Sequence, residues 1–257
     1  MSVAKFALKN MIREIAGHRS HRKYLPDPIP TDVMRRMLEA AVRASNTGNM
    51  QVYSIIVTTD PELRERLAPC HFNQPAMSAP AVFTFCADVR RFSRWCRLRG
   101  AKPEYDNFVW FLNAMSDALL ASENLALEAE AHGLGICYLG TTFYTAPKIS
   151  EILHIPDGVI PVMTVVVGYP AEEVPLTDRL PLGAVVHENV YSDPPDAEIE
   201  AFWAEREASE ETAGLLEANG LPNLARIFTE RRYKGDDNRA FSKVYFDELV
   251  RKGFFNQ

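Results

Sequence analysis

Two continuous apolar segments, residues 81–87 and 159–167, constrain the fold of this chain more than any other feature. Each has the length of a strand and does not alternate between polar and apolar side chains, which indicates a strand covered on both faces. Residues 52–59 and 136–139 are predicted as further strands. The longest helical pattern, residues 107–132, is apolar on most sides and is typical of a central helix or a subunit interface. The sequence therefore predicts an α+β protein whose hydrophobic strands are enclosed by helices.

Shorter helices are predicted between these segments. Residues 5–15 have a helical period that ends at Gly17, and Thr31 is expected to cap a helix over residues 31–41. Asp60 and Pro61 open another short helix, and a further one is predicted over residues 144–153.

The character of the chain changes near residue 193. The sequence beyond it carries many acids and little strand signal, and its helix-length stretches are broken near residues 220 and 235. We therefore expect one domain over residues 1–192 and a helical C-terminal extension over residues 193–257, which would cover the domain or a partner subunit.

Composition excludes several classes of protein. The 257 residues contain 28 basic and 34 acidic side chains, a net charge of −6, so a bulk electrostatic grip on nucleic acid or membrane is not expected. The four cysteines have no metal-ligand spacing, and Cys86 and Cys137 lie in apolar strands where they should act as small hydrophobes. The N-terminus has no uninterrupted apolar region and no segment is long enough to span a bilayer, so a cytoplasmic location is expected.

Familiar phosphate and nucleophile motifs are absent. Gly133 and Gly135 begin a stretch similar to a dinucleotide fingerprint, but Tyr138 occupies the third glycine position and the helix precedes the strand. The sequence has no P-loop, no H-E-x-x-H and no G-x-S-x-G. These absences leave no side-chain acid–base pair or nucleophile as a strong candidate.

Three basic clusters stand out in this acidic chain. Residues 18–23, HRSHRK, hold five basic side chains and a hydroxyl, a donor set that suits a phosphate but also suits a solvated turn. Five arginines between residues 90 and 99 would suit an anionic substrate, although nothing nearby identifies one. A third cluster, formed by Arg231, Arg232, Lys234 and Arg239, could meet a phosphate group or could be a solvated turn.

The first basic cluster is followed along the chain by a series of short, recognisable sequence stretches. The stretch HRSHRKY is followed by PIP, by SNTGNMQ at residues 45–51, by FCAD at 85–88, by GLGICYLG at 133–140, by GYPA at 168–171 and by RLP at 179–181. In this order, from about residue 10 to 192, the stretches resemble the nitroreductase superfamily. The C-terminal helices are loosely similar to the branch that contains the oxygen-insensitive nitroreductases and the NADPH–flavin oxidoreductases.

This resemblance implies an intertwined α+β homodimer with a central mixed or antiparallel sheet and one FMN per site. It implies that His18, Arg19, Ser20 and Arg179 hold the FMN phosphate and that Arg22 supports the reduced flavin near N1 and O2. It further implies that Ser45, Asn46 and Thr47 form a small loop contributed by the partner subunit. The remaining contacts would come from the side chain of Asn73 and from the backbone amides of Gly140 and Thr141. Gly140 could instead only end a strand, and Asn46 and Thr47 could be only turn formers.

The implied activity is hydride transfer from NAD(P)H to nitroaromatics, quinones or flavins in two half-reactions. Alternatives are a specialised dehalogenase or dehydrogenase of the same fold, and a flavin-binding protein with little turnover. Two departures from the pattern bear on the site. Thr177 stands where the similar branch often has a lysine, and Phe143 with Tyr144 makes the acceptor pocket more aromatic.

Overall fold

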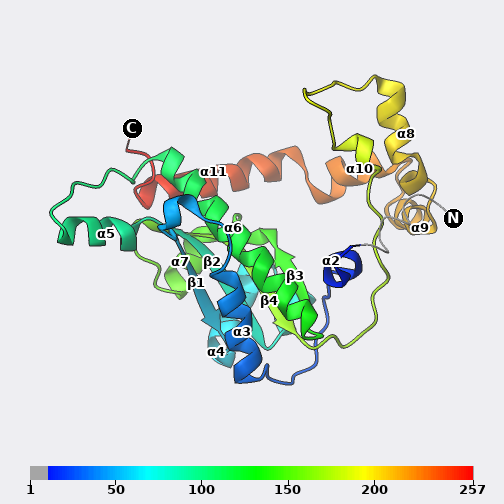
Figure 1. Cartoon of the computed structure of the whole chain (residues 1–257). Coiled ribbons are helices and arrows are strands. Elements are labelled where there is room, and N and C mark those ends of the chain that lie inside the picture. Colours follow the sequence, from blue (N-terminus) through cyan, green and yellow to red (C-terminus); the bar gives the residue numbers. More distant parts are fainter. Residues whose placement is uncertain (1–10, 257) are drawn as a thin grey trace. The chain divides into compact units, whose positions relative to one another are not determined.

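A four-stranded antiparallel sheet forms the centre of the computed structural model, which describes residues 11–256 (Figure 1). The strands are β1 (Tyr53–Thr58), β2 (Ala81–Asp88), β3 (Gly135–Leu139) and β4 (Val159–Gly168), in the order β1-β2-β4-β3. Every residue of β2 is buried, as its apolar run predicted. The predicted α+β fold with an antiparallel sheet is therefore confirmed.

Helices cover both faces of the sheet. The long helix α6 (Phe108–Ala131) packs with Phe83, Phe85 and the second half of α11 (Gly235–Arg251) in one buried cluster. A second cluster joins the other face to α4 (Pro61–Leu67) and α7 (Ala146–Ile152). Nine residues of α6 are buried, which explains why its sequence is apolar on most sides.

The remaining elements are short. They are α2 (Arg13–Gly17), α3 (Thr31–Ala41), α5 (Arg90–Leu98), and the short helices η1 (Thr47–Asn49), η2 (Ala68–His71), η3 (Pro75–Ser78), η4 (Gly140–Thr142) and η5 (Leu182–Ala184). The predicted helix over residues 5–15 lies partly outside the described residues, and α2 ends at Gly17 as expected. Within the described part of the chain, no helix is long and apolar enough to cross a membrane.

Two predicted helix starts are wrong. Thr31 does not cap α3: it is the first helical residue, and Pro30 precedes it without a capping side chain. The helix predicted from residue 144 begins at Ala146, because Pro147 fits only the first turn of a helix. The predicted starts at Asn107 and Asp60 are confirmed, since both side chains accept a hydrogen bond from the first turn of their helix.

The chain divides into two compact units by its internal contacts. Among the described residues, the first unit comprises residues 11–175 and 241–256, and the second comprises residues 176–240. The second unit contains α8 (Asp196–Glu207), α9 (Glu210–Asn219), α10 (Leu224–Ile227) and the π-helix η6 (Phe228–Arg232). The partition at residues 192 and 193 rests on composition and stays a prediction.

Candidate functional site

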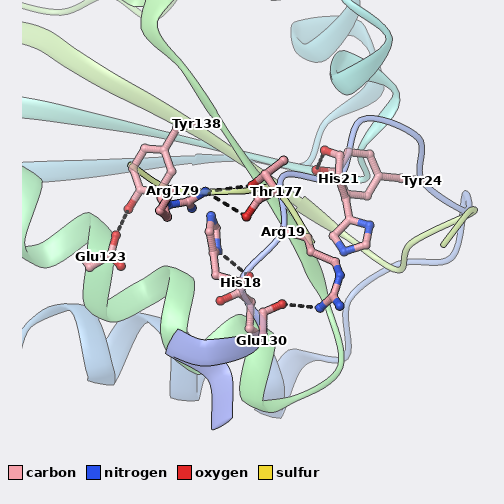
Figure 2. A network of polar contacts seen from close by, with 10 residues as sticks. His18, Arg19, His21, Tyr24, Glu123, Glu130, Tyr138, Thr177 and Arg179 are labelled. Carbon is pink, nitrogen blue, oxygen red and sulfur yellow. Dashed lines mark hydrogen bonds and ion pairs between the residues drawn. The ribbon is translucent and has the colours of Figure 1, made fainter. Parts of the chain in front are cut away.

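The basic segment runs along the edge of the sheet beside β3. Ser20 forms a parallel bridge with Ile136, and the amide of His21 donates to the Ile136 carbonyl at 2.9 Å. The Tyr24 hydroxyl donates to the His21 carbonyl at 2.7 Å and fixes the end of the segment (Figure 2). Beyond this bridge, the Lys23 carbonyl accepts from the amide of Ala171 at 3.0 Å and the amide of Leu25 donates to the Tyr169 carbonyl at 2.9 Å, so the segment continues alongside the stretch that follows β4.

Gly135 is required by the close approach of this segment. A Cβ atom at Gly135 would lie 2.7 Å from Cγ of His21, well inside van der Waals contact. The imidazole of His21 is thereby held against the strand, and burial lowers its pKa. Its Nδ1 is buried and has no hydrogen-bond partner among the described residues.

The basic side chains of this segment differ in whether they have an acidic partner. Nδ1 of His18 lies 2.7 Å from Oε1 of Glu130 on α6 (Figure 2). Arg19 donates to the Gly17 carbonyl at 2.5 Å, and Arg22 lies 3.5 Å from the Ser20 carbonyl. Among the described residues neither arginine has a carboxylate partner. Two guanidinium groups are therefore available to an anion, in the fork geometry that suits phosphate.

The other end of β3 leads into η4, where the predicted amide donors Gly140 and Thr141 lie. A Cβ atom at Gly140 would meet no atom within 4 Å, so the space beside it is open. The first amides of a helix have no acceptor within that helix, so the amides at the start of η4 have no intrahelical partner. The open space and the amides suit a flat ligand that approaches the backbone closely.

A buried histidine joins η4 to the loop that carries Asn73. Nδ1 of His71 lies 2.8 Å from Oγ1 of Thr141, and the Thr145 hydroxyl donates to the Cys70 carbonyl at 2.8 Å. Burial lowers the pKa of His71 to about 4, so the imidazole is neutral at physiological pH. Asn73 has a left-handed backbone with φ of 51° and an exposed side chain next to this link.

Aromatic rings cover the same region. The rings of Tyr144 and Phe241 are stacked with centroids 4.2 Å apart, and Phe72 lies 6.3 Å from Tyr144. Phe143 makes an edge contact with Tyr245 at 5.1 Å. Phe72 remains half exposed, so the cluster offers an apolar surface close to η4.

The small loop of Ser45, Asn46 and Thr47 is held by a buried carboxylate. Oδ1 of Asp117, on α6, accepts hydrogen bonds from the amide of Thr47 at 2.8 Å and from its hydroxyl at 3.0 Å. Oδ1 of Asn46 accepts from the amide of Gln51 at 3.2 Å, while Ser45 is exposed. No described hydrogen bond joins this loop to the basic segment or to η4 of the same chain. Its assignment to the site of a partner subunit stays a prediction.

Arg179 belongs to the second unit, and its assignment to the phosphate also stays a prediction. Its Nη1 donates to Oγ1 of Thr177 and to the Asp178 carbonyl, both at 2.8 Å. Thr177, which departs from the family pattern, thus orients the arginine without adding a charge of its own.

Sequence reasoning missed three residues that position the site: Asp117, His71 and Glu130. Asp117 and Glu130 are acids on the largely apolar helix α6, and an acid among buried alanines is a signal that a partner exists. His71 carries no such signal, because the sequence around it gives no hint that residue 141 is its partner. Cys86 and Cys137 are buried, and burial raises the pKa of both thiols, which agrees with their prediction as apolar core residues.

This fold and this arrangement of residues place the chain in a known class. The model of the nitroreductase family matches residues 15–169, and the chain belongs to that family. The resemblance inferred from the ordered motifs is therefore confirmed.

Particular relatives are similar over most of their length. The FMN reductase (NADPH) of Bacillus subtilis is 35% identical over 188 residues, which cover 72% of this chain and 76% of that protein. The oxygen-insensitive NADPH nitroreductase of Salmonella typhimurium is 33% identical and the match covers 76% and 80% of the two chains. A solved structure from Bacteroides fragilis has 43% identity and a TM-score of 0.93, over 95% of this chain and all of the other.

Proposed function

We propose that this chain is an FMN-dependent NAD(P)H oxidoreductase that passes hydride to a flat, electron-poor acceptor in two half-reactions. The observation that carries the proposal is the pair of guanidinium groups, Arg19 and Arg22, beside β3 without a described carboxylate partner. The two relatives described above, which match this chain over about three quarters of their own length, are named as NADPH-dependent reductases of FMN or of nitro compounds. FMN and NAD(P)H are therefore the cofactor and the donor that fit this family.

The residues present fit FMN on their chemistry. A ribityl phosphate needs several donors at one end, which His18, Arg19 and Ser20 supply near the start of β3. The flat ring system needs open space beside backbone amides, which Gly140 and Thr141 supply beyond the other end of the strand. Gly140 follows Ile136 by four residues, which in a strand spans roughly 13 Å.

Each side chain then has a distinct task. Bound FMN supplies the hydride chemistry, accepting from the reduced nicotinamide and donating to the acceptor. The positive charge of Arg22 favours any negative charge that develops nearby, through direct Coulomb attraction. Neutral His71 fixes the Thr141 hydroxyl at 2.8 Å and so keeps η4 in one orientation. Asp117 does the same for the loop of Thr47.

The acceptor class follows from the surface beside η4. Phe72, Tyr144 and Phe241 offer faces and edges on which an aromatic ring can stack. Nitroaromatics, quinones and flavins share this flat apolar shape, and we propose them as the acceptors.

A homodimer completes the site in this proposal. Val109, Leu112 and Leu120 leave an exposed apolar row on α6, where a second copy can pack. Thr47 is tied to the same helix through Asp117, so a partner seated on α6 would bring this loop close to its own flavin. A cytoplasmic location stays a prediction.

The test follows the visible spectrum of the purified protein under anaerobic conditions while NADPH and then NADH is added. We expect oxidised-flavin bands that bleach with at least one nucleotide. Arg22→Ala should slow the bleaching at least about tenfold, while Arg22→Lys retains most of the rate. Lys23→Ala is the matched control, because this neighbour is exposed and paired with Glu172 at 2.7 Å.

Two results would contradict the proposal. Protein that neither contains nor binds FMN would remove the cofactor, and flavin that stays oxidised with both nucleotides would favour a binding protein. Equal rates in Arg22→Ala and Lys23→Ala would remove the role of Arg22.

A further inference from the structure

We propose that the first unit holds a second small-molecule site, for an organic anion with an apolar body, in a cavity between α5 and the sheet. The cavity has a volume of about 330 Å³, in the range of sites that hold a single-ring compound. Its walls come from β1, the end of β2, α5, the start of β4 and the loop of residues 153–156 after α7. It lies on the β1 side of the sheet, whereas Ser20 pairs with β3 at the opposite edge.

Three arginines give one side of the cavity a positive charge. Arg90 donates to the Asp157 carbonyl at 3.2 Å, and Arg91 donates to the carbonyls of Gln51 and Tyr53. Arg94 lines the cavity and has no hydrogen-bond or ion-pair partner among the described residues. None of the three forms an ion pair with a described carboxylate, in a chain whose net charge is −6.

The carboxylate that lines the cavity does not neutralise this charge. Oδ1 of Asp88 accepts from the amide of Arg91 at 3.1 Å, and Oδ2 accepts from the hydroxyl of Ser54 at 2.5 Å. Asp88 thus fixes the start of α5 and the adjacent strand. With three guanidinium groups against one engaged carboxylate, the cavity is complementary to an anion.

The opposite side of the cavity is apolar. Ile56 of β1, Leu153, Ile155 and Val159 line it. Inorganic phosphate would leave this surface in water, whereas a ring or short chain that carries a carboxylate or phosphate would cover it. The two sides together define an amphipathic organic anion.

The loop that forms the wall is built rigidly. His154 lines the cavity with a left-handed backbone, φ of 52°, which a non-glycine residue adopts only where its surroundings enforce it. Behind the wall, the buried Lys252 directs its ammonium to the carbonyls of Ile155 and Pro156. Burial removes water from the ammonium of Lys252, which is unfavourable for a charged group. Its hydrogen bonds to the two carbonyls compensate for this loss and hold the wall of the cavity in place.

The structure also separates the arginines that the sequence only grouped. Arg90, Arg91 and Arg94 line the cavity, whereas Arg97 and Arg99 of the same basic stretch do not. Arg94 and Arg97 are both exposed arginines of α5. Arg97 is therefore a matched control for any general effect of charge.

The test is isothermal titration of the full-length, flavin-loaded protein with benzoate, phenyl phosphate, neutral benzamide and inorganic phosphate. We expect saturable binding of benzoate or phenyl phosphate, with benzamide and inorganic phosphate at least about tenfold weaker. Benzoate and phenyl phosphate distinguish a carboxylate from a phosphate ligand. Arg94→Gln should weaken binding at least about tenfold, while Arg97→Gln and Arg22→Ala leave it unchanged.

Three outcomes would overturn the proposal: no saturable binding of either organic anion, equal binding of benzamide, or equal loss in Arg94→Gln and Arg97→Gln. Melting curves of the variants confirm that they fold. Unchanged binding in Arg22→Ala separates this site from the proposed flavin site, so the two proposals can fail independently.

Discussion

Replacing Gly135 by alanine tests whether β3 positions the basic segment. The added Cβ would lie 2.7 Å from Cγ, 2.8 Å from Cδ2 and 2.9 Å from Cβ of His21, where favourable carbon contacts need about 3.5–4.0 Å. Neither side can yield easily. Gly135 pairs with Gly168 across the sheet, and the His21 amide is bonded to Ile136.

Overpacking of this kind costs about 1–3 kcal/mol of folding free energy. For a chain of this size, that corresponds to a melting temperature lower by roughly 2–12 °C. Displacement of His21 also moves Arg19 and Ser20, so the FMN dissociation constant should rise about tenfold or more. Thermal unfolding followed by circular dichroism measures the first effect on flavin-free protein, and a fluorescence titration with FMN measures the second.

Gly140→Ala is the control for stability. It adds the same methyl group where no atom lies within 4 Å, so its melting temperature should match the wild type. Its FMN affinity should still fall if the flavin approaches this backbone. A Gly135→Ala variant that melts like the wild type and binds FMN equally well would refute the positioning role of β3.

Three further predictions concern residues that hold the site. Asp117→Ala should lower the free energy of unfolding by about 2–4 kcal/mol, because the amide and the hydroxyl of Thr47 both lose their acceptor. Asp117→Asn should lower it less, because the amide oxygen can still accept. Urea titrations measure both changes, and equal losses in the two variants would contradict this account. Because burial lowers the pKa of His71 to about 4 from 6.5, the unfolded chain takes up the proton first, and stability should fall by roughly 3 kcal/mol between pH 6.5 and 4. In His71→Gln, stability should depend much less on pH between 6.5 and 4. If the pH dependence is unchanged in this variant, a group other than His71 causes the loss of stability. Thr177→Lys should tighten FMN binding severalfold by adding a cation beside Arg179, and unchanged affinity in the same fluorescence titration would place Arg179 away from the phosphate.

The sequence by itself determined which segments form the interior. The unbroken apolar runs of β2 and β4 predicted strands covered on both faces, since any exposed face would have required polar residues at alternate positions. Asn107 and Asp60 marked the starts of α6 and α4, because capping uses a side chain and an amide three residues apart. The ordered motifs identified the family because each is a short stretch that the sequence itself displays, in the family's order.

Only the tertiary structure decided how the site is held and where the arginines of α5 point. His71 meets Thr141 and Thr47 meets Asp117, each across 70 residues of chain, and His18 meets Glu130 across 112. Local pattern records propensity and periodicity but not which distant side chains a fold brings together, so these partners could not be predicted. The same holds for the cavity, because Arg94 and Ile155 share it only after α5 and the loop following α7 have packed against one sheet.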